Sequence, residues 1–306
     1  MSFSTPLAAL TRGALLLCAV LLTAQTPADP SQIKIPVAQA RNFGAKEGDV
    51  PEDPREWGRG QHLGFPTWQG SPEMPNDVFT FARLRYNSYG GRGWGRRRGG
   101  SWLTDYPDSD LNFSFRLQQM TSLQVNPKGA IVDIEAAQLK HFPFVYMIEV
   151  GDISLSDEEA RILREYMLNG GFVMVDDFWG TEEYATFYSA FKQIFPDKEP
   201  KELPIEHEVF HTVFDLKVKP QIPSVGAALD GRSQGITYEW GKPGTKEVHY
   251  QGVFDDKGRM VMIICHNTDL GDGWEEEGTD PWYFREFSEK YAYPLGINII
   301  FYAMTH

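Results

Sequence analysis

The fold is decided by the stretch 156–180, which reads SDEEARILREYMLNGGFVMVDDFWG. Ser156 is a suitable N-cap, and Glu159 three residues later completes a capping box, so a helix is predicted to begin here. Gly170 supplies the positive φ with which many helices end. The apolar run 172–175 shows no polar alternation, which is typical of a strand covered on both faces. The stretch therefore predicts a helix, a glycine stop and a buried parallel strand.

Two carboxylates, Asp176 and Asp177, stand where that strand ends. In open α/β sheets, ligands bind outside the carboxyl ends of the strands. Two carboxylates held close together raise one pKa, so that an acid and a base coexist. An Asp in this place also caps the helix predicted to begin at Thr181. Both interpretations, a functional pair and a helix cap, stay open.

Strands and helices alternate around this stretch. Strands are predicted over 78–86, 130–135 and 144–150, and helices over 110–121, 157–168 and 181–194. The alternation predicts a mostly parallel sheet in a Rossmann-like or flavodoxin-like three-layer α/β domain over 76–306. Further β segments are predicted over 235–240, 247–254 and 259–266, with a hairpin turn at 255–258, and a last helix over about 281–302.

Four segments carry a resemblance to a known family: 79–86 (FTFARLRY), 104–113 (TDYPDSDLNF), 156–180 and 266–269 (HNTD). They resemble the uncharacterised bacterial domain-of-unknown-function family 4159. The resemblance covers about 76–306, and it implies a fold like that of class I glutamine amidotransferases. It implies no activity.

The N-terminus has the pattern of a targeting segment. Arg12 precedes the apolar run 13–24, which is shorter than the about 20 residues that cross a bilayer and is typical of a signal peptide. We predict a signal peptide over 1–28 and an extended Pro/Gly-rich arm or linker over 29–75. The protein is therefore expected to be exported, periplasmic or extracellular. The alternative is an inner-membrane anchor formed by the same segment left uncleaved, which would be the chain's only membrane contact.

The charge balance restricts the class of partner. The 42 Asp and Glu against 29 Lys and Arg give a net charge of −13, which disfavours nucleic acid as a partner. The loop 90–100 is the one basic cluster, and it is interpreted either as an anion grip or as a solvated loop. It lacks the Gly-Lys-Ser/Thr end of a P-loop. An envelope protein or a small ligand is the expected partner, and no cofactor is predicted.

Amidotransferase chemistry lacks its nucleophile in this chain. It needs a Cys on a sharp strand–helix turn with a His in reach. Cys265 is the only Cys after the predicted signal peptide, and it stands next to His266 in a predicted strand. Neighbouring side chains of a strand point to opposite faces, so the two cannot pair. Cys265 is predicted to be a small core residue, and glutaminase activity is not expected.

His207 and His211 match the His-Glu-x-x-His pattern of zinc proteases. Pro204 lies too close for a long helix, and no third ligand follows at a usual distance. A short helical turn is predicted instead, with one or both His near the carboxyl edge of the sheet. The loop 266–275 (HNTDLGDGWE) has the composition of a cation loop but not the EF-hand spacing, so a binding loop and a polar turn both stay open.

These residues are expected to share one cleft at the carboxyl edge. The catalytic candidates are Asp177, His207 and His211. The ligand-binding candidates are Arg83, Tyr86, Trp102, Asp105, Asp176, His266, Asn267 and Asp269. No metal-ligand set is predicted.

Two functions follow as hypotheses. The first is a non-catalytic binding or assembly module of the cell envelope, without the Cys-His-Glu triad. The second is a hydrolase, metal-dependent or not, in which Asp177 is the base and His207 or His211 the acid or metal ligand.

Overall fold

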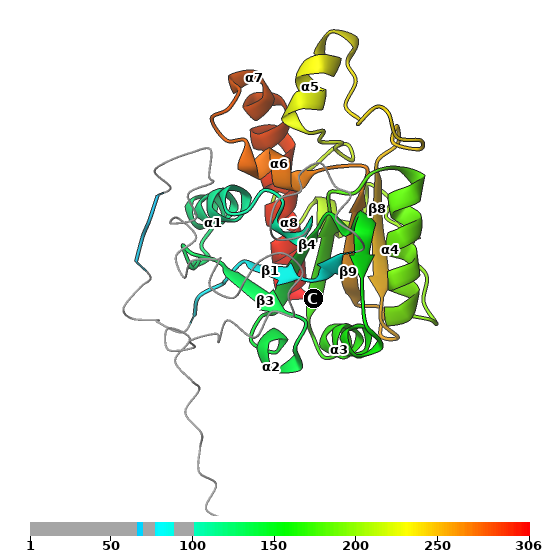
Figure 1. The fold of residues 1–306 in the computed structure, drawn as a ribbon. Coiled ribbons are helices and arrows are strands. Elements are labelled where there is room, and N and C mark those ends of the chain that lie inside the picture. The colour runs from blue at the N-terminus through cyan, green and yellow to red at the C-terminus, as the bar shows by residue number, and fades with distance from the viewer. Residues whose placement is uncertain (1–65, 70–76, 89–100) are drawn as a thin grey trace, which may run out of the picture.

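The computed structural model describes residues 66–69, 77–88 and 101–306 (Figure 1). The predicted signal peptide, the arm 29–75 apart from 66–69, and the basic loop 90–100 lie outside these residues. Within the described ranges, no helix has both the length and the apolar character that a bilayer crossing requires.

The described strands are short. They are β1 (Ala82–Arg85), β2 (Asn87–Ser88), β3 (Ala130–Asp133), β4 (Phe144–Ile148), β5 (Ile153–Ser154), β6 (Phe172–Asp176), β7 (Lys201–Glu202), β8 (His249–Phe254) and β9 (Met260–His266).

The described helices are of three kinds. The α-helices are α1 (Asp108–Met120), α2 (Ala136–Leu139), α3 (Asp157–Leu168), α4 (Gly180–Ile194), α5 (Val225–Gly231), α6 (Leu270–Glu275), α7 (Pro281–Tyr283) and α8 (Tyr293–Thr305). The 3₁₀ turns are η3 (Ser101–Leu103), η4 (Val150–Asp152), η5 (Glu208–Phe210) and η6 (Arg232–Gln234), and η7 (Phe284–Ala292) is a π-helix.

Seven strands form the central sheet in the order β3-β1-β4-β6-β9-β8-β7. The neighbours from β3 to β9 are parallel, whereas β8 is antiparallel to β9 and β7. Counted along the chain, the five parallel strands stand in the order 2-1-3-4-5, which is the flavodoxin-like order. The order reverses between β1 and β4, and ligands of such sheets bind at the carboxyl ends beside that reversal. The predicted mostly parallel α/β sheet is confirmed.

Helices cover both faces of the sheet (Figure 1). One core cluster joins the sheet to α1, α6 and α8, and it includes Phe172 and Met174 of β6. The other joins the sheet to α3 and α4, and it includes Val173 and Val175. Because side chains alternate along a strand, the next residue, Asp176, faces the layer that contains α6.

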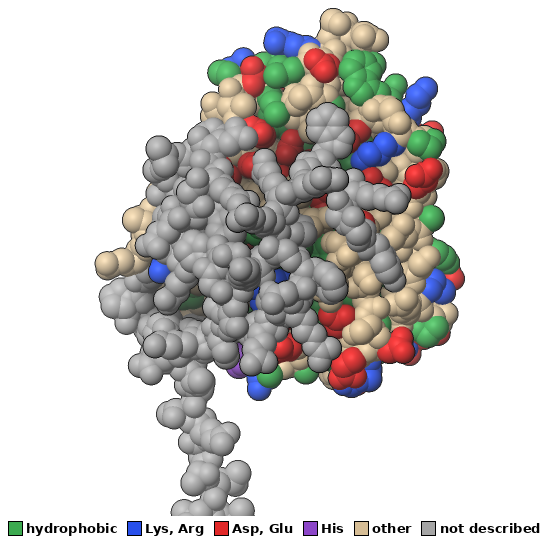
Figure 2. All heavy atoms as spheres, viewed as in Figure 1, with side chains coloured by type: hydrophobic (Ala, Val, Ile, Leu, Met, Phe, Trp, Pro, Cys, Tyr) green, Lys and Arg blue, Asp and Glu red, His purple; other side chains and the backbone are tan. Residues whose placement is uncertain are grey.

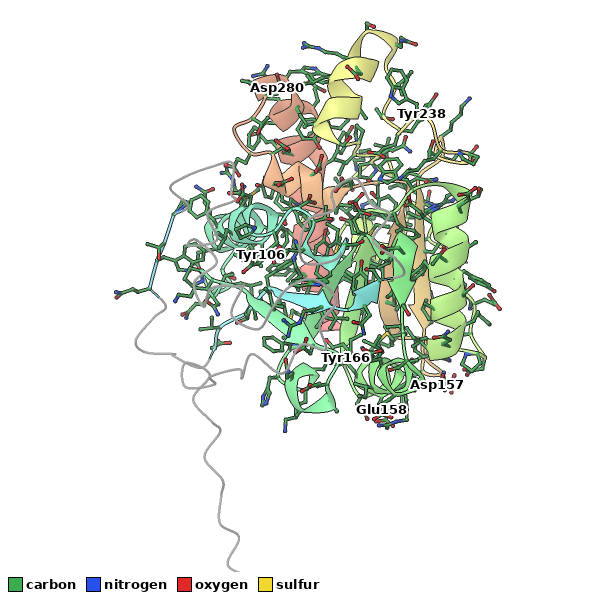
Figure 3. The ribbon with its side chains drawn as sticks, in the orientation of Figure 1. Tyr106, Asp157, Glu158, Tyr166, Tyr238 and Asp280 are labelled. Atoms are coloured by element: carbon green, nitrogen blue, oxygen red, sulfur yellow. The ribbon has the colours of Figure 1, made fainter. Side chains whose placement is uncertain are left out.

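The deciding stretch folds as predicted. The Ser156 hydroxyl accepts a hydrogen bond from the Glu159 amide at 3.2 Å, and the Glu159 carboxylate accepts one from the Ser156 amide at 2.8 Å. Gly170 has a φ of 111°. A Cβ at Gly171 would overlap the Tyr166 ring, which lies against the start of β6 (Figure 3).

Two predicted elements differ in the structure. Residues 235–240 form no strand, because Gly235 ends η6 with a φ of 66° and no neighbouring strand is there to pair with the segment. The last helix is not one α-helix: α7 passes into the π-helix η7, and α8 completes it.

Candidate functional site

Asp176, the last residue of β6, fixes α6 on the carboxyl edge of the sheet. Its Oδ2 accepts hydrogen bonds from the Tyr146 hydroxyl at 3.0 Å and from the Leu270 and Gly271 amides at 2.9 and 3.1 Å. These amides open α6, so Asp176 caps that helix. Burial raises the pKa of Asp176 to about 7, against the lowering effect of these hydrogen bonds. The cap interpretation thus applies to α6, not to the helix that follows in the sequence.

Three buried carboxylates meet beside this anchor. Asp105 follows η3, Asp177 follows β6, and Asp269 precedes α6. One oxygen from each lies within 4.8 Å of the others, and the three residues are 4–7% exposed. Asp105 and Asp177 hold φ values of 62° and 51°. Non-glycine residues seldom adopt this left-handed conformation, and where they do it often serves a site.

Arg83 positions the loop that carries Asp105. Its guanidinium donates to the Trp102 and Thr104 carbonyls at 3.0 and 2.8 Å, just before Asp105. It also pairs with the Asp110 carboxylate and donates to Ser109 Oγ at 2.8 Å. Arg83 is fully buried and its donors are committed to the protein. We therefore place Arg83 as a clamp, not as a group that contacts ligand.

Among the described residues, the Oδ2 atom of Asp105 is buried and has no hydrogen-bond partner. By contrast, Asp177 Oδ1 accepts from the Trp179 indole at 3.1 Å, and Asp269 Oδ1 accepts from the Asp272 amide at 2.7 Å. An unpaired buried carboxylate is costly, and each such group in a folded protein requires an explanation. Gly271 lies against Asp105 Oδ2, and it has no Cβ to fill the space.

The cluster repels itself electrostatically. Burial, and then Glu275, Asp272 and Asp177, raise the pKa of Asp105 well above its ordinary value. Burial first, and neighbouring carboxylates second, likewise raise the pKa of Asp177 and of Asp269. The acidic surplus extends over the surface, where Asp and Glu side chains recur across the described part of the face in Figure 2.

Two basic groups of the described residues near the cluster are paired with other acids. Arg83 pairs with Asp110, and Lys242 donates to Glu183 at 2.7 Å. Burial, and then Glu183, raise the pKa of Glu149 to about 8, and Lys242 only partly opposes this. Protons or a bound cation would relieve this repulsion.

Gly271→Ala tests the space beside Asp105. The new Cβ would overlap Asp105 Oδ2, so we expect the variant to lose divalent-cation binding, read by calorimetric titration. Gly226→Ala in α5 is the matched control, because nothing lies within 4 Å of its Cβ and binding should be unchanged. Normal binding by Gly271→Ala would show that Asp105 does not face a ligand.

The other candidates near this edge are held by the protein itself. Tyr86 donates its hydroxyl to the Ile148 and Glu149 carbonyls, and Trp102 is 3% exposed in the core. His266 Nε2 donates to the Gly180 carbonyl at 3.1 Å, and burial lowers its pKa to about 4. Asn267 accepts from the Gly180 amide and donates to two loop carbonyls. These contacts fix the loops around the cluster.

Cys265 is fully buried in the core, as predicted. Burial raises the pKa of its thiol well above the ordinary value, so the nucleophilic thiolate is disfavoured.

The His207 ring does not reach the carboxyl edge, and the prediction of its position is corrected. The His207 ring contacts Phe254 and Tyr302, and Tyr302 contacts Phe172, the first residue of β6. Asp177 follows the opposite end of that strand. The His211 ring is bonded to Asp215 and to the Ile205 carbonyl, both at 2.7 Å. The chain returns to the amino edge after α4, which the motif alone does not reveal.

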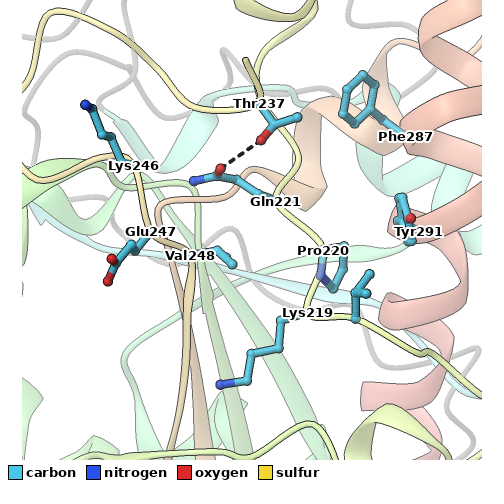
Figure 4. Close-up of a pocket in the computed structure, with 10 residues that line it drawn as sticks. Lys219, Pro220, Gln221, Thr237, Lys246, Glu247, Val248, Phe287 and Tyr291 are labelled. Carbon is cyan, nitrogen blue, oxygen red and sulfur yellow. Dashed lines mark hydrogen bonds between the residues drawn. The ribbon is translucent and has the colours of Figure 1, made fainter. Parts of the chain in front are cut away.

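A surface pocket of about 580 Å³ lies beside η7 (Figure 4). Its lining includes Lys219, Lys246, Phe287 and Tyr291 but none of the three clustered aspartates. Gln221, which accepts from Thr237 at 2.9 Å, forms part of its wall. The pocket and the acidic cluster are therefore separate features.

Sequence reasoning did not select Asp272 or Glu149, which act on the pKa values of the cluster. Asp272 lies in the segment 266–275, and the many polar residues of that segment could have indicated it. Glu149 directly follows β4, as Asp177 follows β6, and the same strand-end rule would have found it.

The family model of the Domain of unknown function (DUF4159) matches residues 80–304. The chain belongs to this family. All three clustered aspartates lie within the DUF4159 region. Among curated proteins, none matches the chain.

Proposed function

We propose that this chain is a binding module whose ligand site is built on a hard divalent cation, Ca²⁺, Mg²⁺ or Mn²⁺, held by Asp105, Asp177 and Asp269. The observation that carries the proposal is the convergence of three buried carboxylates, one of which has a buried oxygen without a hydrogen-bond partner among the described residues. Carboxylate oxygens are the ligands that these cations prefer. Zinc in proteins is held mainly by Cys and His, which the cluster does not contain.

The spacing of the oxygens agrees with one bound ion. Metal–oxygen distances of about 2.1 Å for Mg²⁺ and about 2.5 Å for Ca²⁺ put opposite ligands about 4 to 5 Å apart. The oxygens of the cluster lie within 4.8 Å of one another. A cation there would also offset the mutual repulsion of the three carboxylates.

The test is the thermal stability of the cation-stripped full chain, with and without added cation, near pH 5 and near pH 8. A carboxyl whose pKa is raised by folding stabilises the protein below its unfolded pKa, and that stability is lost as the pH rises through the folded pKa. The raised pKa values, about 7 for Asp176 and about 8 for Glu149, place this loss between about pH 4 and pH 8. Without cation, stability should therefore fall from pH 5 to pH 8.

Added Ca²⁺, Mg²⁺ or Mn²⁺ should reverse this fall. At a hundred times its dissociation constant, a ligand stabilises by about 2.7 kcal/mol, and the gain should be larger near pH 8, where protons do not compete. No cation-dependent shift at either pH would overturn the proposal.

We also propose that the module is exported and acts at the cell envelope, on a small ligand or a protein partner. Its support is the apolar run 13–24 behind Arg12. The class I amidotransferase-like fold belongs to the same proposal, supported by the strand order. Cell fractionation with mass analysis of the mature chain tests export. An intact chain in the cytosol would contradict it.

The hydrolase alternative has less support than the binding module. The His207 ring packs near the start of β6, at the edge opposite Asp177, and the His211 ring is bonded to Asp215 and to the Ile205 carbonyl. The form of the alternative that the described contacts favour is a cation-dependent reaction at the acidic cluster.

A further inference from the structure

We propose that the same edge takes a second divalent cation, held by Asp105, Asp272 and Glu275, so that Asp105 bridges a two-cation centre. The inference rests on the proposed function, since it adds an ion to the same site. One oxygen from each of these residues lies within 4.8 Å of the others. Asp105 is the only member that this group shares with Asp177 and Asp269.

The geometry of α6 turns the two new ligands toward Asp105. Asp272 and Glu275 are three residues apart, so they lie on one face of the helix. Asp176 holds the Leu270 and Gly271 amides, and Asp269 holds the Asp272 amide. Three hydrogen bonds thus fix the first turn of α6. They also fix the orientation of the helix face that carries Asp272 and Glu275.

An independent observation points to a ligand between the two groups. Asp105 is 5% exposed, and its Oδ2 is buried without partner among the described residues. The missing Cβ of Gly271 leaves room beside that oxygen, and the Asp105 carboxylate belongs to both groups. A bridging carboxylate uses both of its oxygens, one for each ion.

The charges favour two ions over one. The two groups together contain five carboxylates. Asp272 receives one amide hydrogen bond, from Val225 at 3.0 Å, and the neighbouring acids Glu275, Glu276 and Glu239 repel its carboxylate.

The consequence is chemical. Two cations that share a carboxylate stand about 3.5–4 Å apart, the spacing at which hydrolases clamp the attacking and leaving oxygens of a substrate. A second ion would therefore favour the cation-dependent hydrolase over the simple binding module.

The experiment is the stoichiometry of Mn²⁺ binding to the cation-stripped full chain, by equilibrium dialysis and electron paramagnetic resonance. We expect two Mn²⁺ per chain with a spin-coupled signal. Glu275→Gln should retain one Mn²⁺ without coupling, and Asp105→Asn should weaken both sites. Glu289→Gln, an exposed acid on η7, should retain two.

The possible failures are distinguishable. One Mn²⁺ per chain that is unaffected by Glu275→Gln would overturn the second site and leave the proposed function standing. No bound Mn²⁺ in the parent chain would overturn both.

Discussion

Asp105→Asn is expected to abolish cation-dependent stabilisation and, at the same time, to stabilise the cation-free protein near pH 8. The amide keeps the shape of the carboxyl and tolerates the left-handed backbone at this position. It removes a buried charge whose Oδ2 has no hydrogen-bond partner among the described residues, and it supplies N–H groups to the neighbouring carboxylates. The gain without cation should be on the order of 1–3 kcal/mol, the usual cost of an unsatisfied buried polar group.

Thermal or denaturant unfolding with and without Mn²⁺ measures both effects. Asp256→Asn is the control, because its side chain is 95% exposed and far from the cluster in the fold, at the turn between β8 and β9. We expect Asp105→Asn to be more stable than the parent without Mn²⁺ and less stable with it. This combination is typical of a residue that serves binding at the expense of stability. An Asp105→Asn variant with an undiminished Mn²⁺ shift would remove Asp105 from the site.

Arg83→Met is expected to be the most destabilising single change discussed here, by about 3–5 kcal/mol, because breaking a buried ion pair leaves an uncompensated charge. The charge left behind is Asp110, which is 2% exposed. The Trp102 and Thr104 carbonyls lose their donor as well. Since they precede Asp105, cation affinity should fall with stability.

Urea unfolding measures this loss, and Arg161→Met serves as control. Arg161 pairs with Glu158 and Glu165, but its side chain is 52% exposed, so little change is expected. Adding Asp110→Leu to Arg83→Met should recover part of the loss, because an apolar pair replaces the stranded charge. If Arg83→Met resembled Arg161→Met in stability, Arg83 would not be the clamp.

Local chemistry explains why one part of the fold was predictable. The capping box at Ser156, the positive φ at Gly170 and the uniform burial of β6 depend on neighbours in the sequence. The strand-end rule then placed Asp105, Asp177 and Asp269 at one edge, and the structure brings their oxygens together. Their role as ligands stays a prediction.

Tertiary packing explains the parts that were not predictable. His207 lies away from Asp177 because its ring packs against Tyr302 and Phe254 at the amino edge of the sheet. Residues 235–240 have strand-like composition but no neighbouring strand. The role of Arg83 as a clamp follows only from its hydrogen bonds to four residues, Trp102, Thr104, Ser109 and Asp110.

The most direct test is the anomalous scattering of Mn²⁺ in crystals of the full chain grown with MnCl₂. The account predicts a peak within about 2.0–2.6 Å of carboxylate oxygens of Asp105, Asp177 and Asp269. An ordered structure with Mn²⁺ bound elsewhere, for example at His211 and Asp215, and no peak among these three aspartates would contradict it.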